Sequence, residues 1–144
     1  MQFQVLSRWF SATAKTVTGT LSSAATTVTL ANAGTARVTA VTITVTAVGG
    51  GPLTGVKVGR TGYTELEYTG VIQPSKALEI NTGAWSVLND GVADYTTEHF
   101  RLTANHHEVF WLRLPRLTGA DVVVTRTGGS ATDTAVFSYY EAWQ

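Results

Sequence analysis

The chain has 144 residues and no cysteine, and its ten Lys and Arg residues balance ten Asp and Glu residues, giving a formal net charge of zero. A chain of this length forms one domain and can bury a core without disulfides. Since there is no basic field for nucleic acid or anionic lipid, and no apolar run as long as a membrane span, we expect neither nucleic acid nor a membrane as partner.

The composition also predicts the fold class and a tendency to associate. The sequence has 25 threonines and 17 valines, and both are β-branched residues that favour strands. Only 14% of residues are charged, against about 25% in ordinary domains. A neutral, sparsely charged surface gives little protection against association. We therefore expect an all-β protein that packs against partners.

The first ten residues, Met1–Phe10, are too apolar for an ordinary tail. Their apolar residues, which we take as a candidate assembly interface, are Phe3, Val5, Leu6, Trp9 and Phe10. The spacing fits a loose helix face overall, whereas Phe3 and Val5 alternate as on a strand. We expect an arm, either extended or short helical, that packs on its own domain or on a neighbour.

The segment Ser11–Thr27 is rich in Ser, Thr, Ala and Gly and is typical of a linker, unless Val17 and Leu21 lie on a short strand. The expected organisation is therefore an N-terminal arm and linker over residues 1–26 and a β-sandwich domain over residues 27–144.

Short strands with turns between them follow along the rest of the chain. After Thr27–Leu30, the run Arg37–Thr46 changes its apolar phase at Ala40–Val41, which predicts a bulge or a strand that leaves one sheet for the other. Further strands are expected near residues 55–59, 63–68, 94–102, 108–114, 121–125 and 134–143. About ten short strands with Gly-rich turns predict an antiparallel β-sandwich, galectin-like or jelly-roll-like.

The stretch Gly70–Gly91 predicts a hairpin. Asn81-Thr82-Gly83 supplies turn residues that tolerate positive φ, and Asn89-Asp90-Gly91 ends the second strand with the same chemistry. Apolar and polar residues alternate on both strands. The expected core residues of this hairpin are Leu78, Ile80, Trp85 and Val87.

Nothing in the sequence supports catalysis. The histidines are His99, His106 and His107, and the acidic residues near them are Asp90, Asp94, Glu98 and Glu108. Adjacent residues on a strand point to opposite faces, so the two neighbouring histidines would share a metal only in a loop. The carboxylates match no calcium signature, and Gly49-Gly50-Gly51 lacks the Lys of a phosphate loop. We predict no catalytic site, metal or cofactor.

The aromatic residues offer a different kind of site. An exposed Trp or Tyr would form a platform for a sugar ring or for a partner protein. The sequence does not identify which aromatic side chains are exposed, so the residues of such a glycan contact stay unknown at this point.

Three segments in order suggest a family. They are Asn32-Ala33-Gly34-Thr35 before the strand Val38–Thr46; the hairpin with Tyr68-Thr69-Gly70, Leu78-Glu79-Ile80-Asn81-Thr82 and Trp85-Ser86-Val87; and Leu117–Thr125 leading to Phe137–Trp143. Together their order and spacing resemble the C-terminal, galectin-like β-sandwich of siphophage distal tail proteins and related phage tail modules. Asp121 departs from the family's usual Asn, and residues 1–26 are too few for the family's ring-forming domain, so the ring-forming role is not carried over.

The resemblance implies a non-enzymatic virion structural protein of the tail or tail tip, assembled in the host cytoplasm. Its expected partners are further copies of itself, in a symmetric oligomer, and other virion proteins. Two alternatives stay open, a capsid decoration protein on the head surface and a carbohydrate-binding module that contacts host surface glycans.

Overall fold

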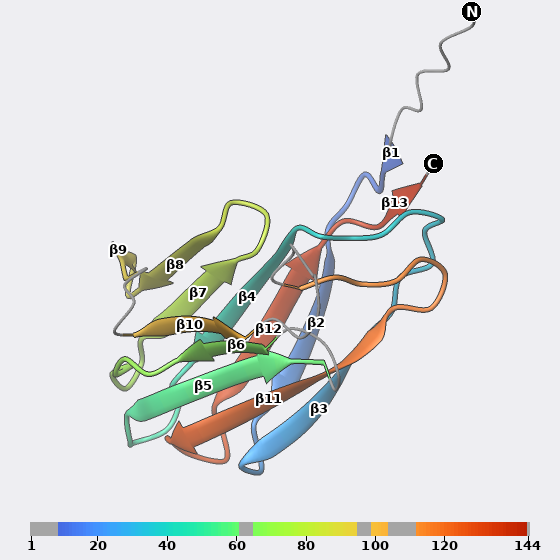
Figure 1. Cartoon of the computed structure of the whole chain (residues 1–144). Helices are drawn as coiled ribbons and strands as arrows, with labels where there is room; N and C mark the ends of the chain where they lie inside the picture. The colour runs from blue at the N-terminus through green and yellow to red at the C-terminus, as the bar shows by residue number, and fades with distance from the viewer. Residues whose placement is uncertain (1–8, 61–64, 95–98, 104–111, 144) are drawn as a thin grey trace, which may run out of the picture.

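The computed structural model describes residues 9–60, 65–94, 99–103 and 112–143. These residues form an antiparallel β-sandwich (Figure 1). The first sheet has, in spatial order, β2 (Lys15–Thr20), β12 (Thr134–Tyr139), β4 (Val41–Thr46), β7 (Ala77–Asn81), β8 (Ser86–Asn89) and β9 (Val92–Ala93). The second has β10 (Phe100–Thr103), β6 (Glu65–Tyr68), β5 (Leu53–Gly59), β11 (Ala120–Gly128) and β3 (Ala25–Leu30). A third sheet pairs β1 (Trp9–Phe10) with β13 (Ala142–Trp143).

Alternation along the strands builds the core between the two large sheets. On β4, Val41, Ile43 and Val45 are fully buried, while the intervening threonines are only half-buried on the outer face. β12 follows the same rule, with Phe137 and Tyr139 in the core. The period-two pattern of β-branched and aromatic residues thus explains why these segments become strands with one buried face. The all-β prediction is confirmed.

The N-terminal arm is extended where the structure describes it. Trp9 and Phe10 form β1 and pair with β13, so the helical form expected for the arm has no support. The preceding predicted interface residues Phe3, Val5 and Leu6 lie outside the described residues.

The segment expected as a linker contains a strand of the sandwich. Lys15–Thr20 forms β2, which pairs with β12 and places Val17 opposite Phe137. This is the short strand that the sequence allowed around Val17, and it is an edge strand of the first sheet. The division of the chain between residues 26 and 27 stays a prediction.

The change of apolar phase near Ala40 marks a point where the chain changes its pairing partner and no regular strand forms. Val38 forms an isolated bridge with Leu114, and β4 begins only at Val41. The hydroxyl of Thr82 stabilises the break, since it accepts the Val41 N–H at 2.8 Å and donates to the Thr39 carbonyl at 2.8 Å. Both Val38 and Val41 are buried on either side of the break, which accounts for the shifted apolar pattern.

The predicted hairpin is present as β7 and β8, with Ile80 opposite Val87 and Asn81 opposite Ser86. Leu78, Ile80 and Val87 are buried. The side-chain oxygen of Asn81 accepts the N–H groups of the two residues at positions 83 and 84, at 3.1 and 2.9 Å, and so holds the turn.

The prediction that Trp85 belongs to the core is wrong. Trp85 is 53% exposed and has a φ of 56°. The register leaves four residues, 82–85, in the loop, so Trp85 closes the turn in the left-handed conformation instead of starting the strand. The strict alternation places the start of the second strand at Trp85, but the strand starts one residue later, at Ser86, and the left-handed backbone at residue 85 turns the indole off the buried face. At the next turn, Asp90 and Gly91 both have positive φ, 52° and 77°, as a two-residue type I′ hairpin turn requires.

Candidate functional site

An exposed surface among the described residues is formed by the two-stranded sheet of β1 and β13, which we call the terminal ribbon. It extends beyond one end of the sandwich (Figure 1). Trp9 lies opposite Trp143, and Phe10 lies opposite Ala142. Trp9 is 69% exposed and Phe10 is 60% exposed. Two of the five residues predicted for assembly are therefore on an outlying, exposed strand.

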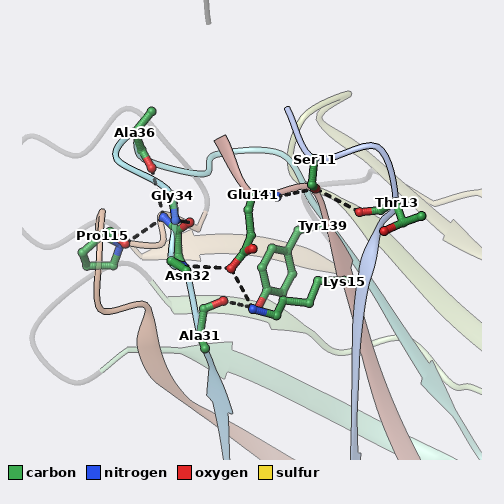
Figure 2. Close-up of polar contacts among 11 residues, drawn as sticks. Ser11, Thr13, Lys15, Ala31, Asn32, Gly34, Ala36, Pro115, Tyr139 and Glu141 are labelled. Atoms are coloured by element: carbon green, nitrogen blue, oxygen red, sulfur yellow. Dashed lines mark hydrogen bonds and ion pairs between the residues drawn. The ribbon is translucent and has the colours of Figure 1, made fainter. Parts of the chain in front are cut away.

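The terminal ribbon is attached to the sandwich through Glu141 (Figure 2). Its carboxylate accepts hydrogen bonds from the Lys15 ammonium at 2.7 Å and from the Ala33 N–H at 2.8 Å. The Ser11 N–H donates to the Glu141 carbonyl at 2.9 Å, and the Glu141 N–H donates back to the Ser11 hydroxyl at 3.1 Å. The pKa of Glu141 lies below its usual value, mainly because of the hydrogen bond from the Ala33 N–H and, to a smaller extent, because of Lys15. An ionised Glu141 thus joins three separate segments.

The loop around Asn32 holds the other side of β13. Asn32 is buried and donates to the carbonyls of Ala36 at 3.0 Å and Pro115 at 2.9 Å, while its oxygen accepts the Gly34 N–H at 3.1 Å. The Ala36 N–H in turn donates to the Ala142 carbonyl at 2.9 Å. A Cβ atom on Gly34 would lie 2.1 Å from the Ala142 carbonyl oxygen, so only glycine allows this approach.

Tyr139 completes the attachment (Figure 2). Its hydroxyl donates to the carbonyl of Ala31 at 2.6 Å, and burial, assisted by the nearby Glu141 charge, raises its pKa. We call these contacts of Ser11, Lys15, Asn32, Tyr139 and Glu141 the ribbon base. The Asn32–Gly34 turn and the Phe137–Trp143 ending, noted separately in the sequence, meet here as one unit.

A small pocket of about 100 Å³ lies beside the terminal ribbon. Its lining consists of Phe10, Arg37, Val38, Thr39, Ala40 and Tyr140. Because the lining is largely apolar and the pocket is small, it suits a single apolar or aromatic side chain. Tyr140 and Trp143 were not among the predicted interface residues, although a Tyr following a buried Tyr139 on a strand points to the opposite face.

The Trp85 loop lies at the same end of the sandwich as the terminal ribbon (Figure 1). Thr82 joins it to the segment that lines the pocket, through the hydrogen bond to the Thr39 carbonyl. Trp9, Phe10, Tyr140 and Trp85 are thus all exposed at this end. Exposed aromatic groups concentrated at one end are typical of a surface that binds a partner.

The predicted acidic and histidine candidates form a structural network where they are described. The Tyr68 hydroxyl donates to Asp94 at 2.5 Å, His99 Nδ1 lies 3.0 Å from the same carboxylate, and Asn89 donates to the Tyr68 hydroxyl at 2.8 Å. Burial raises the pKa of Tyr68, whereas the Tyr68 and His99 hydrogen bonds lower the pKa of Asp94. With a fully buried tyrosine at its centre, the network joins β6 and β8 to the residues before β10.

The remaining metal candidates give no site in the part of the chain that the structure describes. Those residues contain no group of three or more His, Asp or Glu side chains able to hold a metal ion. Asp90 instead pairs with Lys76 at 2.9 Å on the surface. His106, His107, Glu98 and Glu108 lie outside the described residues. Among the described segments there is also no helix long and apolar enough to span a membrane.

Comparison with known proteins gives one informative match. No family model matches the sequence, and no curated protein matches it. Among solved structures, the fold matches the Dit protein (gp 19.1) of phage SPP1, described as a paradigm of the hub adsorption apparatus in phages that infect Gram-positive bacteria. The match has a TM-score of 0.60 at 12% sequence identity, and it covers 95% of this chain and 49% of the Dit chain. The chain therefore has a fold similar to about half of a phage distal tail protein, in agreement with the resemblance found in its sequence.

Proposed function

We propose that the protein is a non-enzymatic structural component of a phage tail, located at or near the tail tip. The observation that carries this proposal is the similarity of fold to SPP1 Dit over 95% of the chain. Since fold alone does not specify function, the proposal also draws on the surface. A neutral chain with few charges and an exposed aromatic end is suited to permanent packing within a particle.

The proposed interface is the terminal ribbon with the arm that leads into it. Trp9 and Phe10 are exposed on β1, and Phe3, Val5 and Leu6 continue the same apolar segment. The ribbon base attaches β1 and β13 to the sandwich through Glu141 and Asn32. An interface residue held by a rigid base loses less entropy on binding. Its partners would be copies of the chain, in a symmetric oligomer, and other virion proteins.

We propose only a structural role for the chain. The chain spans about half the length of the Dit protein that it matches, so the activities of a whole hub are not assigned to it.

The test is to locate the protein on purified virions. We expect immunogold particles at the tail tip, and we expect virions lacking the protein to have defective tails that the wild-type chain restores. Trp9→Ala combined with Phe10→Ala should fail to restore them, whereas Val92→Ala, an equally exposed valine on β9, should succeed. Gold on the head would instead identify a capsid decoration protein and would refute the tail proposal.

The exposed Trp85 favours carbohydrate binding as a second candidate function. Its indole is 53% exposed on a loop held by Asn81 and Thr82, and an indole face packs well against a sugar ring. Specific binding on a glycan array, lost in Trp85→Ala but kept in Val92→Ala, would establish host attachment. An array without specific binding would exclude it.

A further inference from the structure

The outer edge of β1 carries a backbone donor and acceptor directed away from the molecule. The Ser11 N–H donates to the Glu141 carbonyl across the terminal ribbon. Because bonded and non-bonded pairs alternate along an antiparallel ladder, the next pair, Phe10 and Ala142, turn their backbone groups away from each other. The hydrogen bond of Ala142 is consistent with this alternation, because its carbonyl accepts the Ala36 N–H on the side of β13 away from β1. The N–H and C=O of Phe10 therefore point to the outer edge, where no other strand pairs among the described residues.

This edge is suited to receive another strand. A two-stranded sheet with two residues on each strand is too small to be stable by itself. An exposed strand edge is a template for pairing with a further strand. The apolar side chain of Phe10, beside Tyr140 and the small pocket, adds surface that pairing would bury.

The backbone geometry and the charge of the chain make a second copy of this chain a complementary occupant of the edge. One N–H and one C=O on the same residue are self-complementary, because two such residues can exchange both hydrogen bonds across a two-fold axis. The formal net charge of zero places no overall repulsion between two copies.

We propose that β1 pairs antiparallel with β1 of a second copy, with Phe10 directly opposite Phe10 of the partner subunit. Residues directly opposite each other point to the same face of a sheet, so both phenyl rings lie over the pocket side. The four strands of the two terminal ribbons form one continuous sheet. This pairing specifies the oligomer contact of the proposed assembly function and rests on it, but the pairing is tested in solution, whereas the function is tested on virions.

The pairing gives a weak dimer. The contact is far smaller than a standard interface, so we expect half of the chains to be dimeric at about 100 µM. Within a particle, the high local concentration of neighbouring copies makes such a contact effective. Sedimentation equilibrium of the full chain should show the mass rising from 15.3 kDa towards twice that value as the concentration increases to about 1 mM.

Charge substitutions at residue 10 test the register. Phe10→Lys and Phe10→Glu should each be monomeric, since two like charges would face each other across the axis. An equimolar mixture of the two variants should form a heterodimer. Val92→Lys, at a valine 69% exposed on the two-residue edge strand β9, is the matched control and should dimerise as the wild type does.

Cross-linking gives a second measurement. The chain has no cysteine, so Phe10→Cys introduces one thiol per copy, at a pair whose Cα separation permits a disulfide. We expect it to form disulfide dimers at least about tenfold faster than Val92→Cys does. A wild-type chain that stays monomeric up to about 1 mM, a Phe10→Lys variant that still dimerises, or a charge-variant mixture that stays monomeric would each overturn the proposal. Equal cross-linking rates would also overturn it.

Discussion

The carboxylate of Glu141 lies 2.7 Å from the ammonium nitrogen of Lys15, and this contact joins the end of the chain to the first strand of the sandwich. The same carboxylate accepts the Ala33 N–H. The terminal ribbon is therefore attached at a defined angle, although it contributes no residue other than Ala142 to the buried set.

Replacing Glu141 should loosen the terminal ribbon. Glu141→Ala removes two charge-assisted hydrogen bonds, and we expect the free energy of unfolding to fall by about 1–2 kcal/mol, measured by chemical denaturation. Hydrogen exchange should increase at Ser11 and Ala33, whose N–H groups lie at the ribbon base. Lys76→Ala, which breaks the exposed pair with Asp90, is the control and should change stability by less than about 0.5 kcal/mol. Equal losses in both variants would contradict the role given to Glu141.

Removing the Asp133 carboxylate should destabilise the protein. Asp133 is fully buried and accepts the N–H groups of Val48, Gly49 and Ser130 at 2.9, 3.0 and 2.6 Å. Asp133→Ala leaves three part-buried N–H donors without their acceptor, so we expect the free energy of unfolding to fall by about 2 kcal/mol in a denaturation experiment. Asp121→Asn, at an exposed position, is the control and should be nearly neutral. A change below about 0.5 kcal/mol would mean that the loops at Val48–Gly49 and at Ser130 do not depend on this carboxylate.

Stability should fall as the pH is lowered through the acidic range. Burial would raise the pKa of Asp133, but its backbone and Ser130 hydrogen bonds outweigh burial and lower it. The pKa values of Asp94 and Glu141 are lowered by their hydrogen bonds as well. A carboxylate with a depressed folded-state pKa contributes stability that is present above its unfolded value, about 4, and is lost as the pH falls through the folded value. Denaturation curves from about pH 7 to pH 2 should show this loss, and a flat profile would contradict it. Glu141→Gln should reduce its slope.

Glycine at position 34 should be required for the close packing of the Asn32–Gly34 turn against β13. In Gly34→Ala the new methyl group would lie 2.1 Å from the Ala142 carbonyl oxygen. Because this neighbour is a backbone atom and not the end of a flexible side chain, the backbone itself would have to move. We expect a loss of about 1–3 kcal/mol, together with a change in the fluorescence of Trp143. Gly50→Ala, where a Cβ meets nothing within 4 Å, is the matched control and should keep wild-type stability and fluorescence. A tolerated Gly34→Ala would show that the loop can move away from β13 at little cost.

Several elements could be predicted because their signals are local. The alternation of Val41, Ile43 and Val45 with threonines specifies a strand with one buried face. Asp90-Gly91 specifies a two-residue turn through residues that accept positive φ. The wrong prediction for Trp85 has a local origin too, since the second strand of the hairpin starts one residue later than expected and leaves Trp85 in the loop, on the surface.

By itself, the sequence determined the all-β class, the positions of most strands and the resemblance to distal tail proteins, because composition, period and turn chemistry act over a few neighbouring residues. Only the tertiary structure decided how distant segments combine. It brought Asn32, Lys15 and Glu141 together at the ribbon base, and it left Trp9 and Phe10 exposed on an outlying strand. Such contacts depend on strand order and register between residues far apart in the chain, and a single sequence carries no local signal for either.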